Sequence, residues 1–161
     1  FYDGAAWQSF GGKLGQVVST NLPTPFSTAS TSFTDITGLS VSITPTAATS
    51  KILVLVGLQA AVSGDIVIMF QTVRNSTAIN IGDAAGSRIR TSFAMADNSG
   101  FFRSQFSLNF LDSPSTTSAT TYKMQMFVNS GTGYINRTQG DSDGATTPRT
   151  TSNITVMEIL V

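Results

Sequence analysis

The sequence lacks cysteine and histidine entirely, and it contains one Glu and three Lys among 161 residues. Without cysteine, neither a disulfide framework nor a thiolate metal site can form. Without cysteine and histidine, Ser-His-Asp and Cys-His catalytic arrangements are excluded. We therefore expect a protein that is not an enzyme and that binds no cofactor.

Charge and long apolar runs are also scarce. Only 11% of residues are charged, with nine basic and nine acidic side chains, so we expect no nucleic-acid partner. The longest apolar run, Ile52–Leu58, is far shorter than the ~20 residues of a membrane-spanning helix, which argues against membrane insertion. The mean hydropathy of +0.13 is high for so uncharged a chain. It indicates either a buried subunit interface in a homo-oligomer or a surface solvated by Ser and Thr.

The sequence is rich in residues that favour strands and turns. It contains 23 Thr and 21 Ser, and Thr favours strands whereas Ser favours turns. Ile52–Leu58 is typical of a strand covered on both faces, and its β-branched residues and central Gly57 argue against a buried helix. After a turn at Ser63–Asp65, the run Ile66–Phe70 is predicted to pair back on it as a hairpin.

The remaining strands are predicted mainly from alternation of apolar and polar residues. Leu39–Thr44, Phe102–Leu111 and Thr121–Asn129 each have one apolar face, and Phe33–Ile36 is predicted as a separate strand. Ile154–Val161 is almost wholly apolar, which predicts a central strand. About ten short strands predict an all-β fold, an antiparallel β-sandwich of jelly-roll type, over residues 13–161. Residues 1–12 are interpreted as a linker or the end of an upstream module.

Three blocks of sequence resemble a known group of proteins. They are SFTDITGLSVSITPTAATSKILVLV (32–56), FSLNFLDSPSTTSATTYKMQ (106–125) and SNITVMEI (152–159). Together they resemble the C-terminal globular domain of tail-fibre and other virion proteins of marine bacteriophages, and the predicted strand order resembles the jelly rolls of tumour-necrosis-factor-like and complement-type heads. The resemblance implies a trimer but no catalytic residues.

A long polar loop, Gln139–Arg149, is the place where a ligand would bind, because loops on a rigid sandwich carry most binding residues. Asp141 and Asp143 lie in a D-x-D-G sequence that resembles the opening of a calcium loop, but the later ligands are missing, so a plain turn is favoured. An incidental aromatic at a hairpin end is the alternative to a sugar site here. The candidate glycan-contact residues are Tyr134, Asn136, Arg137, Asp141 and Asp143.

A second set of residues is predicted to face outward. Arg88 and Arg90 fall on one face of a predicted strand, Ser87–Met95, where they would bind an anion, cross to a neighbouring subunit, or simply be solvated. Outward apolar residues invite a partner sheet, although a register slip of one residue would turn them inward. The candidate subunit-interface residues are Phe101, Phe102, Phe127, Arg88 and Arg90.

These observations lead to two hypotheses about function. In the first, the chain is a virion structural protein, the globular tip of a tail or head fibre, acting as a homotrimer that contacts a cell-surface glycan with avidity. In the second, it is a capsid-decoration or filament-forming subunit without a receptor. In either case we expect a location in the virion, after synthesis in the host cytoplasm, among other virion proteins. An enzyme would require two converging carboxylates at glycosidase spacing.

Overall fold

The computed structural model describes residues 13–97 and 104–161, and all of their regular secondary structure is β-strand. No helix in these residues is long and apolar enough to cross a membrane. The described strands number eleven, which confirms the all-β prediction. They are β1 (Leu14–Leu22), β2 (Phe26–Thr28), β3 (Thr34–Ile43), β4 (Lys51–Val62), β5 (Ile66–Arg74), β6 (Thr77–Ile79), β7 (Phe93–Asp97), β8 (Ser104–Asp112), β9 (Thr120–Val128), β10 (Gly133–Ile135) and β11 (Ser152–Ile159).

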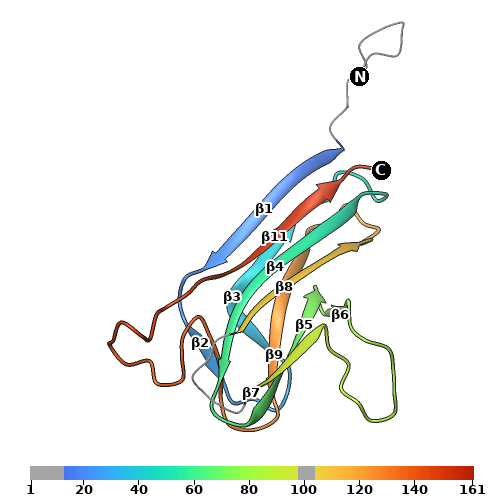
Figure 1. The fold of residues 1–161 in the computed structure, drawn as a ribbon. Coiled ribbons are helices and arrows are strands. Elements are labelled where there is room, and N and C mark those ends of the chain that lie inside the picture. The colour runs from blue at the N-terminus through green and yellow to red at the C-terminus, as the bar shows by residue number, and fades with distance from the viewer. Residues whose placement is uncertain (1–12, 98–103) are drawn as a thin grey trace, which may run out of the picture.

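The strands form two antiparallel sheets that face each other (Figure 1). The first sheet has the order β1-β11-β4-β8, and β10 and β2 continue it beyond the end of β11. The second has the order β3-β9-β5-β7, with β6 on the far end of β5. Four strand pairs are nested along the sequence, so that each pair encloses the next: β1–β11, β3–β9, β4–β8 and β5–β7. Such nested pairing is typical of a jelly roll, and it confirms the predicted architecture.

The core lies between the two sheets and is built by simple alternation. On β4 the inward residues from Ile52 to Val62 are buried, and Tyr122, Met124, Met126 and Val128 on β9 face them as predicted. Where β7 approaches β8, three aromatic rings close the core. The ring of Phe93 lies 4.8 Å from that of Phe70 and 5.0 Å from that of Phe106.

A polar clamp joins the sheets at one end of the sandwich. The Arg74 guanidinium of the second sheet binds both carboxylate oxygens of Asp112 on the first, at 2.9 and 2.8 Å. The buried Tyr122 hydroxyl donates to the same carboxylate at 2.7 Å. Burial, together with this hydrogen bond to Asp112, raises the pKa of the Tyr122 phenol. The phenol therefore stays a donor, and the clamp keeps its geometry.

The predicted hairpin of Ile52–Leu58 with Ile66–Phe70 is wrong. β4 and β5 follow one another along the chain, but β4 belongs to the first sheet and β5 to the second. The edges of β4 are taken by β8 and by β11 with β10, and those of β5 by β9 and by β7 with β6. The two strands therefore meet through their apolar faces across the core, a choice that hydrophobicity alone does not distinguish from edge pairing.

Two further strand predictions need correction. Phe33–Ile36 and Leu39–Thr44 belong largely to one strand, β3, whose register shifts between Asp35 and Ser40 near Gly38. The predicted strand Ser87–Met95 is a loop up to residue 92, because the edge of β5 beside it is already occupied by β6 and β7. Arg88 and Arg90 are exposed in this loop rather than on a strand face, and Arg90 Nε donates to the Gly82 carbonyl at 2.6 Å.

Candidate functional site

The segment 136–150 between β10 and β11 projects away from the sandwich (Figure 1). Asn136 begins it and anchors it to the body of the protein. The Asn136 amide nitrogen donates to the carbonyls of Leu22 and Thr24 at 2.7 and 3.1 Å, and its amide oxygen accepts from Ser152 Oγ at 2.7 Å. The segment therefore leaves and re-enters the sandwich at fixed points.

Burial removes Asn136 from the candidate glycan contacts. Its side chain is 0% exposed and its hydrogen bonds all run to the protein interior. Its φ of 62° lies in the left-handed region, which Asn tolerates better than most residues. The sequence suggested a surface amide, but the same residue type also suits a buried position with this backbone conformation and two carbonyls to satisfy.

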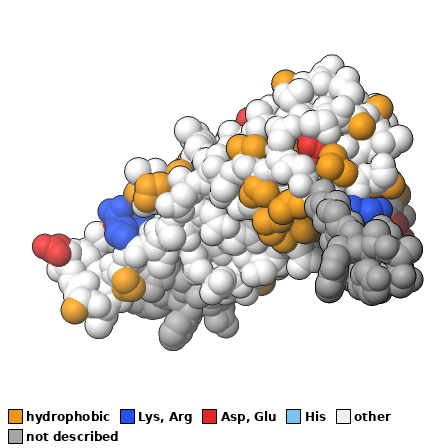
Figure 2. Space-filling view, turned by 90° about the horizontal axis from the view of Figure 1, so that it is seen from above, with side chains coloured by type: hydrophobic (Ala, Val, Ile, Leu, Met, Phe, Trp, Pro, Cys, Tyr) orange, Lys and Arg blue, Asp and Glu red, His pale blue; other side chains and the backbone are white. Residues whose placement is uncertain are grey.

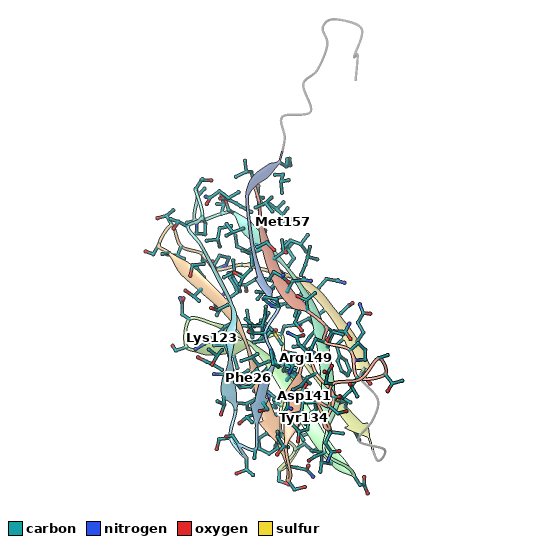
Figure 3. All side chains as sticks on the ribbon, turned by 90° about the vertical axis from the view of Figure 1, so that its left-hand side faces the viewer. Phe26, Lys123, Tyr134, Asp141, Arg149 and Met157 are labelled. Carbon is teal, nitrogen blue, oxygen red and sulfur yellow. The ribbon has the colours of Figure 1, made fainter. Side chains whose placement is uncertain are left out.

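A stack of alternating groups braces the projecting loop. The Arg137 guanidinium lies over the Tyr134 ring, 4.4 Å from its centroid, and contacts the Asp141 carboxylate at 3.1 Å. Arg149 reaches the same carboxylate oxygen at 2.7 Å, and Figure 3 shows Tyr134, Asp141 and Arg149 close together. Tyr134 is only 8% exposed, so it supports Arg137 and is not itself open to stacking by a sugar.

The outer part of the loop encloses a shallow depression of about 250 Å³. The Thr147 hydroxyl donates within the loop, to the carbonyl of Ser142, and the Thr147 amide donates to the Gly144 carbonyl at 3.0 Å. Asp143 is exposed at the depression and pairs with no other described side chain. The lining residues are Asp141, Ser142, Asp143, Gly144, Thr147 and Arg149.

Asp141 and Asp143 line the same depression, whereas Glu158 lies inside the sandwich. Within residues 13–97 and 104–161 no three potential ligands group to hold a metal ion. Asp141 is held between two guanidinium groups. Glu158 points into the sandwich, fully buried, where Oε1 accepts from the Thr46 amide at 2.6 Å and from its hydroxyl at 2.7 Å. Its surroundings are those of a structural carboxylate, a role that its position in an apolar strand did not reveal.

The described members of the predicted interface lie on different elements. Phe127 lies on the outer face of the second sheet, its ring 5.7 Å from that of Phe33. Arg88 and Arg90 belong to the 80–92 loop, and Phe101 and Phe102 lie outside the described residues. Sequence reasoning missed a different apolar surface on the first sheet, where Leu14, Val17 and Leu111 are 51%, 50% and 56% exposed. The sequence signal for this surface was the presence of apolar residues in both phases of the alternation, Leu53 and Leu55 in β4 and Met157 and Ile159 in β11.

No family model matches the chain, and no curated protein matches it either. Among solved structures, it is similar to the infectious bursal disease virus VP2 subviral particle, with 12% identity and a TM-score of 0.48 over 90% of this chain and 32% of that one. A structure of the Gx strain of this virus has 13% identity and a TM-score of 0.43, covering 91% of this chain and 43% of that one. Particles of T=1 symmetry derived from the virus have 15% identity and a TM-score of 0.41, covering 90% and 40%.

The chain thus spans less than half the length of these viral chains. At such low identities and TM-scores the likeness carries no information about activity or partners.

Proposed function

We propose that the chain is a non-enzymatic structural subunit of a virus particle that presents the 136–150 loop for weak contact with a cell-surface glycan. The observation that carries this proposal is the loop itself. It is tied at its base by the buried Asn136, braced by the stack from Tyr134 to Arg149, and open at Asp143. A rigid scaffold that holds polar side chains on a projecting loop is the usual setting for recognition. The resemblance of residues 32–56, 106–125 and 152–159 to phage virion proteins supports the particle context.

The charges of the loop indicate the kind of sugar. Its four charged residues, Arg137, Asp141, Asp143 and Arg149, cancel in pairs, and three of them are bound to one another. The exposed acceptor and donor groups therefore suit the hydroxyls of a neutral glycan better than an acidic one. The depression is smaller than the ~300–1,000 Å³ of deep ligand pockets, so each contact is weak and depends on several copies for avidity.

The first prediction concerns Asp143. Replacing it as D143N removes a charged acceptor, and we expect retention of the multivalent protein on its glycan to fall roughly tenfold. A glycan array probed with the chain displayed on beads measures this, with D83N, an exposed change on the distant 80–92 loop, as the matched control. Equal loss in both variants, or no retained glycan for the unchanged chain, would contradict a receptor-binding loop.

A second candidate is a purely structural subunit of a capsid or filament, without a receptor. The exposed apolar residues Leu14, Val17 and Leu111 favour it, because such side chains call for cover by another protein surface. Antibody labelling of purified particles distinguishes the two candidates. Label at distal tips supports the receptor-contacting role, whereas a regular lattice of label over the shell supports the second.

A further inference from the structure

Four apolar side chains form a continuous row across the outer face of the first sheet. Strand register places Val17 of β1 beside Met157 of β11, Met157 beside Leu53 of β4, and Leu53 beside Leu111 of β8. Residues that are directly opposite in an antiparallel pair point to the same face. We call Val17, Met157, Leu53 and Leu111 the apolar row, and Figure 3 shows Met157 on β11.

Further apolar residues widen this row along the strands. Leu14 and Ile159 are paired on one side of it, and Leu55 of β4 lies on the other. Val17 and Leu111, at the two ends of the row, are 50% and 56% exposed. Lys51 is at the margin of the surface, opposite Ile159, and the row itself carries no charge.

The outer face of the second sheet is different. There Lys123 Nζ binds the Asp35 carboxylate at 2.7 Å, and the Gln125 amide donates to the same carboxylate at 2.7 Å. Gln71 donates to Gln125 at 2.6 Å, so a ladder of satisfied polar groups crosses that face. Figure 2 shows how few charged side chains the visible surface carries beside its hydrophobic groups. Met69 and Phe127 are also paired on the outer face of the second sheet, but the half-exposed large hydrophobic side chains of the described strands, Leu14, Val17 and Leu111, all lie on the first sheet.

We infer that the apolar row is a two-fold interface between two copies of this chain, packed with the outer faces of their first sheets together. Besides their buried inner faces, β4 presents Leu53 and Leu55 outward and β11 presents Met157 and Ile159 outward, as strands covered on both faces do. The described residues cover only the inner face of these two strands. A second copy supplies the missing layer at the ~10 Å spacing of packed sheets.

Charge and size favour a second copy as the partner. The row is neutral and the chain has nine basic and nine acidic residues, so two copies meet without repulsion. Four strands of about nine residues present a face of roughly 20 by 30 Å. Because the accessible area of side chains exceeds this projection of about 600 Å², the face approaches the ~800 Å² per partner of a standard interface.

Two copies can pack in either of two registers, and in each register the apolar row of one copy contacts the apolar row of the other. A two-fold axis along the row places Leu111 against Leu111 of the second copy. An axis along the strands places Leu111 against Val17 and Met157 against Leu53. In both registers apolar side chains meet apolar side chains over the full width of the sheet.

The test is the mass of the full chain in solution, measured by sedimentation equilibrium. We expect the unchanged chain to form dimers and L111E to weaken them roughly 100-fold or more, since the variant buries unpaired carboxylates. The matched control is S40E, which places the same charge on the exposed outer face of the second sheet and leaves the dimer intact. Circular dichroism checks that both variants remain folded.

Charge pairing then identifies the register and guards against a variant that merely misfolds. Mixing L111E with L111K restores dimers if the axis runs along the row, and mixing L111E with V17K restores them if it runs along the strands. A chain that is monomeric at its highest soluble concentration overturns the inference. So does a dimer insensitive to L111E, a trimer, or a dimer that forms only after removal of residues 1–12. Because the readout is mass, this inference and glycan binding can fail separately.

Discussion

A single buried amide, that of Asn136, connects three parts of the chain that are distant in sequence. It donates to the carbonyls of Leu22, at the end of β1, and Thr24, and it accepts from Ser152 at the start of β11. Buried carbonyls without donors are costly because they lose water and gain nothing in exchange. The Asn136 side chain therefore helps to fix the base of the projecting loop, together with the backbone hydrogen bond from Thr150 to Asn136.

We predict that N136A lowers the free energy of unfolding by about 3 kcal/mol, because it removes three hydrogen bonds of a buried side chain at once. The matched control is N80A. Asn80 also has a positive φ, 51° against 62°, but it is exposed and its side chain makes no hydrogen bond to another described residue. Urea unfolding of both variants separates the cost of the backbone conformation from that of the hydrogen bonds. Similar losses in the two would contradict the anchoring role.

Glu158 is the second buried polar residue with a structural role. Burial alone would raise the pKa of its carboxyl, but hydrogen bonds from the Thr46 hydroxyl and amide outweigh burial and lower it. Gln16 of β1 also donates to it, at 3.3 Å. The ionised carboxylate thus ties β11 to β1 and to the loop that precedes β4.

A carboxyl whose pKa is lower in the folded state stabilises the protein above the unfolded pKa, here near the ordinary value of 4.5. That stabilisation is lost as pH falls through the folded pKa. We expect E158Q to cost about 1–3 kcal/mol at neutral pH, and the difference from the unchanged protein should shrink in acid. Urea unfolding over a pH series measures it, with D83N, a change at an exposed carboxylate on the 80–92 loop, as the control. A difference independent of pH would contradict the assignment.

At the scale of elements, β3 shows how closely the sheets approach. Gly38 has a φ of 86°, and a Cβ built there would lie 2.9 Å from Leu22 Cδ1 of the opposite sheet. We predict that G38A lowers the free energy of unfolding by about 1–3 kcal/mol through backbone strain and crowding. G64A is the control, because Gly64 has a φ of 84° but open space around its Cα. Equal losses by thermal unfolding would show that crowding against Leu22 contributes nothing.

Strand faces could be read from the sequence because the pleat repeats every two residues. The inward positions of β9 and the alternation in β8 follow the printed residues directly. The central place of β11 was also predictable, since a strand with no polar face has to be covered. Which sheet a strand joins was not, because β4 and β5 offer the same apolar faces to an edge partner and to a partner across the core.

The candidate site was only partly predictable for a related reason. The sequence marks 139–149 as a polar loop, and the structure places Arg137 and Asp141 in contact there. It does not distinguish an exposed Asn or Tyr from a buried one, because Asn136 and Tyr134 are used for their hydrogen-bonding and stacking capacity within the fold. The type of a side chain determines which interactions it can make, whereas its burial depends on which other parts of the chain pack against it.

At the scale of the whole molecule, three surfaces have different character. The outer face of the second sheet is a polar ladder, that of the first sheet carries the apolar row, and the 136–150 loop projects beyond both. Assembly and recognition would then use separate surfaces, so a dimer formed through the row would still present two loops. Two linked loops raise the effective local concentration of binding groups without any new contact.

The nested strand pairs also determine the order in which the two sheets can be completed as the chain is synthesised. β1 leaves the ribosome first, but its partner β11 is almost the last part of the domain to emerge, and β4 has β11 on one edge. Neither strand can complete its hydrogen bonds before β11 has emerged, and pairing across so long a loop is slow. Until residue 159 is released, the apolar strands are open to other nascent copies. A fold whose outer pairs close with β11 therefore leaves apolar strands open to aggregation until that strand is in place.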